Sequence, residues 1–201
     1  RIVFQVAGNN TIGMGHIYRA LTLARELSDH EVLFVSDPNN RVAAEEIVKH
    51  DYGLEVYKPG EMIKKISALK PHMVIHDVLD TKKEDIYELR DGGAVVISFE
   101  DLGSGARHTD LTINELYDIP QFRGSHVLWG NSYFILRDEF EAARVQRFKT
   151  NVNCVMLAFG GTDQHDLARC TYRAIKALCR ELKIFIHIVT GPGYAGYDRL
   201  S

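Results

Sequence analysis

The 201-residue sequence has few cysteines, no excess of basic charge and no long apolar run. Its three cysteines (Cys154, Cys170 and Cys179) are odd in number and form no CxxC pair, so we expect no disulfide framework and a cytoplasmic location. Lysine and arginine total 24 against 27 acidic residues, and the net charge of −3 argues against nucleic-acid binding. No apolar run approaches the roughly 20 residues that span a bilayer, and no signal peptide is expected.

The remaining composition is that of a globular protein. Hydrophobic residues make up 45% of the sequence and charged residues 25%, which suits a packed core. The length fits one large or two modest domains. Because the chain begins at Arg1 without methionine and stops at Ser201 soon after a predicted strand, we expect it to be part of a longer multidomain protein.

Strands and helices alternate along the first 130 residues. Short apolar runs predict strands at 2–7, 31–36, 54–57, 73–75, 94–99, 111–114 and 127–129. Apolar residues at helical spacing predict helices at 16–27, 42–50, 62–69 and 84–90. This alternation predicts an α/β fold with a parallel, Rossmann-like sheet covered by helices on both faces.

A further βαβ unit is expected near the end of the chain. Residues 138–148 are predicted to form a charged connecting helix and 149–153 a hinge. A strand at 154–159, a helix at 167–182 and a strand at 184–190 follow. With roughly 50 residues this unit is too small for a good core of its own. It either extends the first sheet or begins a second α/β domain.

The first loop, residues 8–16, has the features of an anion site. Gly13 and Gly15 permit close backbone approach, and the helix that starts there directs free N–H groups and a positive dipole end at a ligand. The lysine of a P-loop is missing, and Tyr18 replaces the third small residue of a dinucleotide fingerprint. Asp37 stands about where a ribose-binding acid would, so a dinucleotide site is disfavoured but not excluded.

His16 is the candidate general base of this loop. The positive end of the helix dipole favours a neutral imidazole that can accept a proton, although a histidine here can also simply cap the helix. Arg19, one turn later, either holds a phosphate oxygen or pairs with a carboxylate such as Asp77. Asp77 comes just past the predicted strand 73–75 and Asn114 ends the strand 111–114, at the sheet edge where open parallel sheets bind their ligands.

A second glycine pair repeats this design in the later unit. The backbone N–H groups of Gly160 and Gly161 can cradle a diphosphate, with the Thr162 hydroxyl as an added donor. The alternative is a plain tight turn in which Asp163 favours the start of the following helix.

Two other groups of residues are not expected to carry chemistry. His72 and His76 lie along a predicted strand without an obvious third ligand, so no metal site is expected. Cys170 and Cys179 fall in a helical stretch, where packing is the expected role of their thiols.

The segment TIGMGHIYRALTLARELS, which contains the glycine loop and His16, resembles the opening motif of PseG-type UDP-sugar hydrolases of the pseudaminic acid pathway. These enzymes are relatives of MurG with a two-domain GT-B fold. Further matches follow in order and span nearly the whole chain: VVISFED at 95–101, DLTIN at 110–114, GNSYFILRDEF at 130–140 and FGGTD at 159–163.

The resemblance implies an N-terminal sugar-side domain at 1–150 and an incomplete C-terminal nucleotide-binding domain at 151–201. It implies attack of water on the anomeric carbon of UDP-2,4-diacetamido-2,4,6-trideoxy-β-L-altropyranose, which releases UDP without a metal or other cofactor. The family's catalytic histidine maps to His16. We therefore predict as catalytic residues His16 and Asp77, as substrate-binding residues Gly13, Gly15, Arg19 and Asn114, and as diphosphate-binding residues Gly160, Gly161, Thr162 and Asp163.

One position departs from the family pattern. Leu79 stands where these hydrolases tend to carry a tyrosine near the sugar, which leaves the identity of the sugar open. Two alternatives remain: a GT-B glycosyltransferase, in which an acceptor hydroxyl replaces water, and a non-catalytic nucleotide-sugar-binding domain of a larger surface-polysaccharide enzyme.

Overall fold

We describe a computed structural model of the chain that covers residues 1–9, 13–144, 150–191 and 193–200. The chain divides into two compact units. The first contains residues 1–9 and 14–141, and the second contains Gly13 together with the chain from residue 142 onward.

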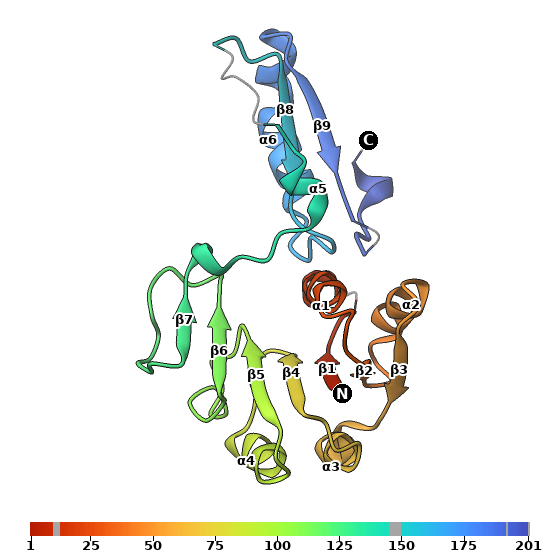
Figure 1. The fold of residues 1–201 in the computed structure, drawn as a ribbon. Helices are drawn as coiled ribbons and strands as arrows, with labels where there is room; N and C mark the ends of the chain where they lie inside the picture. Colours follow the sequence, from red (N-terminus) through yellow and green to blue (C-terminus); the bar gives the residue numbers. More distant parts are fainter. Residues whose placement is uncertain (10–12, 145–149, 192, 201) are drawn as a thin grey trace. The chain divides into compact units, whose positions relative to one another are not determined.

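The first unit is built on a seven-stranded sheet in which all pairings are parallel, with the order β3-β2-β1-β4-β5-β6-β7 (Figure 1). The strands are β1 (Ile2–Val6), β2 (Val32–Ser36), β3 (Gly53–Val56), β4 (Met73–Asp77), β5 (Val95–Phe99), β6 (Leu111–Asn114) and β7 (Val127–Trp129). The predicted α/β architecture is therefore confirmed.

Helices cover both faces of this sheet because its central strands are apolar on both sides. Phe4 of β1 packs in a core with α1 (Gly15–Glu26) and α2 (Arg41–Lys49). The neighbouring residue Val3 points to the other face, into a core with α3 (Met62–Ala68) and α4 (Lys83–Asp91). Short 3₁₀ turns lie at Pro59–Glu61, Asn131–Tyr133 and Tyr197–Arg199.

The order of the strands reverses at the boundary between β1 and β4. The chain moves outward from β1 to β3 on one side and from β4 to β7 on the other. In open α/β sheets the carboxyl edge at such a switch point is where ligands bind. The loop after β1 and the last residue of β4, Asp77, lie at this edge.

In the second unit β8 (Cys154–Ala158) and β9 (Phe185–Val189) pair in parallel as a separate two-stranded sheet, with α6 (Leu167–Glu181) between them in sequence. We expected this segment either to extend the first sheet or to begin a second α/β domain. The described strands β8 and β9 do not extend the first sheet. The assignment of 151–201 to a nucleotide-binding domain stays a prediction.

Two local expectations were wrong. The charged helix predicted at 138–148 is only α5 (Asp138–Glu141): residues 142–144 are not helical, and 145–149 lie outside the described residues. Phe140 is 53% exposed, so this short segment lacks the packed apolar face that holds most helices. The three cysteines are free, but only Cys179 is buried, and Cys170 is exposed rather than packed.

Candidate functional site

The site begins at the glycine loop before α1. Gly13 has a φ of 84°, a conformation that residues with a side chain rarely adopt. A Cβ atom added at Gly13 or Gly15 would meet no atom of the described residues within 4 Å. The first turn of α1 contains no acidic residue, and the N-cap residue Met14 makes no side-chain cap. The start of α1 therefore has the open space and the backbone donors of an anion site.

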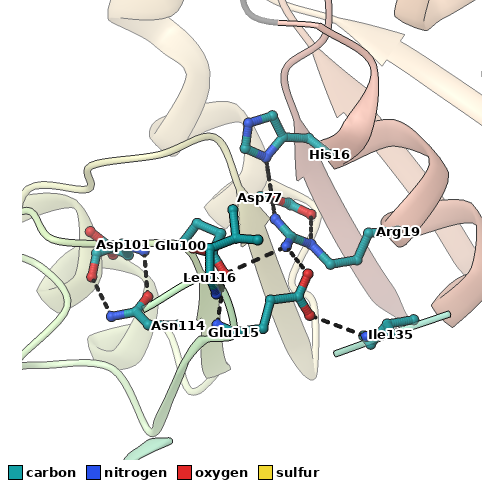
Figure 2. A network of polar contacts seen from close by, with 9 residues as sticks. All are labelled: His16, Arg19, Asp77, Glu100, Asp101, Asn114, Glu115, Leu116 and Ile135. Carbon is teal, nitrogen blue, oxygen red and sulfur yellow. Dashed lines mark hydrogen bonds and ion pairs between the residues drawn. The ribbon is translucent and has the colours of Figure 1, made fainter. Parts of the chain in front are cut away.

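His16 lies in the first turn of α1 with its ring against the end of β4. Its Nδ1 atom is 2.5 Å from Oδ1 of Asp77, and the Asp77 side chain is 1% exposed (Figure 2). Because a carboxylate can only accept, Nδ1 carries the proton of this hydrogen bond. In the neutral ring the lone pair then resides on Nε2, on the ring edge away from Asp77. This is the geometry of an oriented general base.

Arg19, one turn along α1, binds the same carboxylate through two hydrogen bonds. Its Nε donates to Oδ2 of Asp77 over 2.8 Å and its Nη2 to Oδ1 over 2.6 Å. Arg19 is 9% exposed, and its guanidinium lies 5.0 Å from the centroid of the Phe99 ring. Of the two expectations for Arg19, the structure shows the ion pair with Asp77; binding of substrate by Arg19 stays a prediction.

Two further carboxyl groups surround the guanidinium. Nη1 of Arg19 lies 2.5 Å from Oε1 of Glu115, just after β6, and 3.6 Å from Oε1 of Glu100, just after β5 (Figure 2). Burial alone would lower the pKa of Arg19, but hydrogen bonds and charge from Asp77 and Glu115 raise it above its ordinary value. Arg19 is therefore a permanent cation in a buried acidic cluster.

Glu100 is held in an environment that favours its neutral form. Its Oε1 accepts hydrogen bonds from the backbone N–H groups of Glu115 (2.7 Å) and Leu116 (3.3 Å). Its Oε2 is buried without a hydrogen-bond partner among the described residues. Burial raises the pKa of Glu100, against the opposing effect of Arg19.

Asn114 lies at the same sheet edge but its side chain is fully buried. Its Oδ1 accepts from the backbone N–H of Asp101 over 2.9 Å, and its Nδ2 donates to the carbonyl of Asp101 over 3.2 Å. The structure thus gives Asn114 the task of tying β6 to the end of β5. Its predicted contact with substrate would require these bonds to open.

The glycine loop of the second unit has an open backbone. Gly160 has a φ of 75°, and in the part of the chain that the structure describes a Cβ atom added at Gly160 or Gly161 would meet nothing within 4 Å. The carboxylate of Asp163 accepts from the backbone N–H groups of Leu167 and Ala168, each over 2.8 Å, and so caps the start of α6. The N–H groups of Leu167 and Ala168 are thus already bonded. The donors that can bind a diphosphate are therefore the backbone N–H groups of the glycine loop itself.

The loop after β9 supports this glycine loop. Gly193 donates its N–H to the carbonyl of Gly161 over 3.1 Å. A Cβ atom at Gly191 would lie 2.4 Å from the Cα atom of Gly161, a separation that no side chain tolerates. Thr162, with residues 193–196 and Arg199, lines a hollow of about 250 Å³.

Sequence reasoning did not single out two supporting residues. Glu115 follows the predicted Asn114, but its contact with Arg19 joins residues 96 positions apart, which no local pattern reveals. Asn40 is 2% exposed, and its Oδ1 accepts from the backbone N–H of Gly8 over 3.1 Å. Asp37 in turn accepts from Nδ2 of Asn40 over 2.6 Å, so its carboxylate supports the turn before α2.

His72 and His76 do not form a pair. Nδ1 of His72 contacts the N-terminal amine, whereas His76 is buried in the sheet with neither ring nitrogen partnered among the described residues. In the described ranges no group of three or more His, Cys, Asp or Glu side chains is arranged to hold a metal ion. Over those ranges no helix has the length and apolar character needed to cross a membrane.

Comparisons with known proteins give distant relatives. No model of a protein family matches the chain. An uncharacterized protein of Methanocaldococcus jannaschii is 27% identical over 223 residues, which covers 100% of this chain and 44% of that protein. A UDP-2,4-diacetamido-2,4,6-trideoxy-β-L-altropyranose hydrolase of Campylobacter jejuni is 29% identical over 178 residues, which covers 84% of this chain and 63% of the hydrolase. The chain thus spans less than two thirds of the length of either relative.

A solved structure shows the same fold. The crystal structure of MurG from Acinetobacter baumannii matches with a TM-score of 0.55 at 11% sequence identity, over 94% of this chain and 67% of that chain. The chain therefore has an α/β fold of the GT-B type, with distant sequence similarity to a UDP-sugar hydrolase.

Proposed function

We propose that this chain belongs to a nucleotide-sugar hydrolase that splits a UDP-linked diacetamido-trideoxyhexose at its anomeric carbon. The observation that carries the proposal is the His16–Asp77 pair, in which the carboxylate fixes Nδ1 and leaves the lone pair on Nε2, next to the two glycines that precede His16, Gly13 and Gly15. A site that only bound a nucleotide sugar would not need a base held in this way.

His16 acts as the general base in the proposed reaction. Nε2 takes a proton from a water molecule as the water oxygen forms its bond to the anomeric carbon. The bond from that carbon to the diphosphate oxygen breaks, and UDP leaves with the electron pair. Asp77 keeps the proton on Nδ1 and stabilises the imidazolium that forms. A positioned base of this kind contributes roughly 10²–10⁴-fold to the rate.

The remaining predicted residues bind the substrate in this proposal. Gly13 and Gly15 let the sugar side approach the start of α1, where the helix dipole favours negative charge on the leaving group. In the second unit the backbone of Gly160 and Gly161 binds the diphosphate, with the hydroxyl of Thr162 as a further donor.

Leu79 is the residue of this edge that we assign to selection of the sugar. It is 43% exposed two residues after Asp77, and its φ of 70° is unusual for a leucine. An apolar side chain here favours contact with the methyl groups of a deoxy, acetamido sugar over hydrogen bonds to hydroxyls.

The direct test is to incubate the full-length protein with the UDP-diacetamido-trideoxyhexose without an acceptor and to follow the anomeric proton by NMR. Free sugar and UDP in equal amounts support hydrolysis. If the substrate binds but stays intact until an acceptor alcohol is added, the reaction is glycosyl transfer and not hydrolysis. Activity that survives a chelating agent would fit the predicted absence of a metal.

A further inference from the structure

The geometry points to Glu115 as a positioning residue for the His16–Asp77 pair, which it reaches through the guanidinium of Arg19. This inference rests on the proposed role of His16 as the base. It assigns to Glu115, just after β6, a part in the chemistry of His16 on α1 and Asp77 on β4.

The first support is the way the guanidinium is held from two sides. Nε and Nη2 of Arg19 engage the two oxygens of Asp77, and Nη1 engages Oε1 of Glu115. A planar guanidinium that is bonded on both sides has no freedom to rotate about its own axis. Glu115 therefore fixes the direction from which Arg19 presents its donors to Asp77.

The second support is that Glu115 is itself anchored by backbone groups. Its own N–H donates to Oε1 of Glu100 over 2.7 Å. Its Oε2 accepts from the backbone N–H of Ile135 over 3.2 Å (Figure 2). Glu115 is 4% exposed and bonded to two segments, so its position is fixed. It can therefore hold Arg19, and through Arg19 and Asp77 also His16, in one orientation.

The third support is the balance of charge around His16. Arg19 on its own helix and Asp77 from β4 contact His16, and the carboxyl groups of Glu100 and Glu115, just after β5 and β6, contact Arg19 in turn. Three carboxyl groups lie around one guanidinium, so the acidic groups of this cluster outnumber its one arginine. A proton on His16 adds positive charge beside this acidic cluster, so the carboxylate of Glu115 favours the protonated ring that the reaction produces.

The test compares Glu115→Gln and Glu115→Asp with a matched control, Asp101→Asn. Asp101 is fully buried at the same sheet edge, but its carboxylate bonds to Thr81 and Gly103 rather than to Arg19. Protein labelled with ¹⁵N in its histidines is titrated without substrate, and the His16 signals are identified by their loss in His16→Ala. Turnover of the UDP-sugar is measured across the same pH range.

In Glu115→Gln we expect the pH midpoint of the His16 signals, and the acid limb of the rate profile, to move down by roughly half to one pH unit. Glu115→Asp keeps the charge but shortens the side chain, so the midpoint should stay while kcat falls, by up to roughly 10²-fold, with KM little changed. The control should lose stability without moving the midpoint.

An unchanged midpoint in Glu115→Gln, or an equal shift in Asp101→Asn, would overturn the inference. If Glu115→Gln does not fold, full kcat in Glu115→Asp would overturn it as well. The titration needs no turnover, so it decides the role of Glu115 even if the protein does not hydrolyse this sugar. Absent hydrolysis in the wild type would count against the proposed function alone.

Discussion

The Nδ1 atom of His16 lies 2.5 Å from Oδ1 of Asp77, and the two residues are 61 positions apart in the sequence. The contact forms because α1 begins immediately above the carboxyl edge of the sheet, where β4 ends beside β1. A histidine in the first turn of a helix and an aspartate at a strand end are thereby joined into one acid–base pair.

Replacement of Asp77 by asparagine should remove the orientation of the base. The amide N–H of asparagine can donate to a lone pair on Nδ1 and so favour the tautomer that carries its proton on Nε2. That tautomer has no lone pair on Nε2 for water, so we expect kcat to fall by about 10³–10⁴-fold. Arg19 would also lose a buried partner, so the free energy of unfolding should fall by roughly 3 kcal/mol. Turnover and urea unfolding measure the two effects.

The control for this comparison is a variant that loses a carboxylate charge at an exposed position instead of a buried one. Glu45 forms an ion pair with Arg41 on the exposed surface of α2, and Glu45→Gln should change neither turnover nor stability measurably. An Asp77→Asn protein with nearly full kcat would contradict the assigned pair.

His76 should make the fold sensitive to acid. Complete burial in the sheet lowers the pKa of His76 from 6.5 to about 4. Between pH 6.5 and pH 4 the unfolded chain binds a proton at His76 that the folded chain does not. The free energy of unfolding is therefore undiminished above pH 6.5 and falls as the pH drops toward 4. The full loss is about 3 kcal/mol.

His76→Phe removes the titrating ring and its unpartnered nitrogens while keeping an aromatic side chain. Urea unfolding of both proteins at pH 7 and pH 4.5 should show that the wild type loses about 2–3 kcal/mol more than the variant on acidification. Equal losses in the two proteins would mean that His76 is protonated in the folded state at the lower pH.

Gly191→Ala should displace the predicted diphosphate loop. The new methyl group would lie 2.4 Å from the Cα atom of Gly161, so one of the two loops must move. We expect weaker UDP binding by calorimetry together with a lower melting temperature.

Gly161→Ala is the matched control for this change. Its Cβ atom meets no described residue within 4 Å, so the fold should tolerate it, yet it occupies the space in which the diphosphate is proposed to lie. UDP binding should therefore weaken without loss of stability. Unaltered UDP affinity in both variants would place the nucleotide elsewhere.

Much of the fold could be predicted because its signals are local. Alternation within β1 sends Phe4 and Val3 to opposite cores, and turn residues mark most strand ends. The helix predicted beyond Glu141 failed because the charged pattern of that segment says nothing about what it packs against. Whether β8 and β9 join the first sheet is likewise a question of pairing that no local pattern answers.

The candidate site was predictable only in part for the same reason. His16, Arg19 and Asp77 stand at a helix start and a strand end, where sequence reasoning looks for ligands. Glu115 becomes visible only once β6 is placed beside β5. Asn114 and Asp163 were predicted to bind substrate from their places at a strand end and near a helix start. Their side chains instead bond to nearby backbone groups, which a sequence pattern does not reveal.

The central claim is that His16 is the base of a nucleotide-sugar hydrolase, and the most direct measurement compares His16→Ala with the wild type in the full-length protein. Release of UDP and free sugar is followed by NMR, and UDP affinity is measured by calorimetry on the same samples. We predict that the variant loses roughly 10²–10⁴-fold in turnover while its affinity for UDP stays the same. Turnover within a few-fold of the wild type would contradict the assignment of His16 as the base.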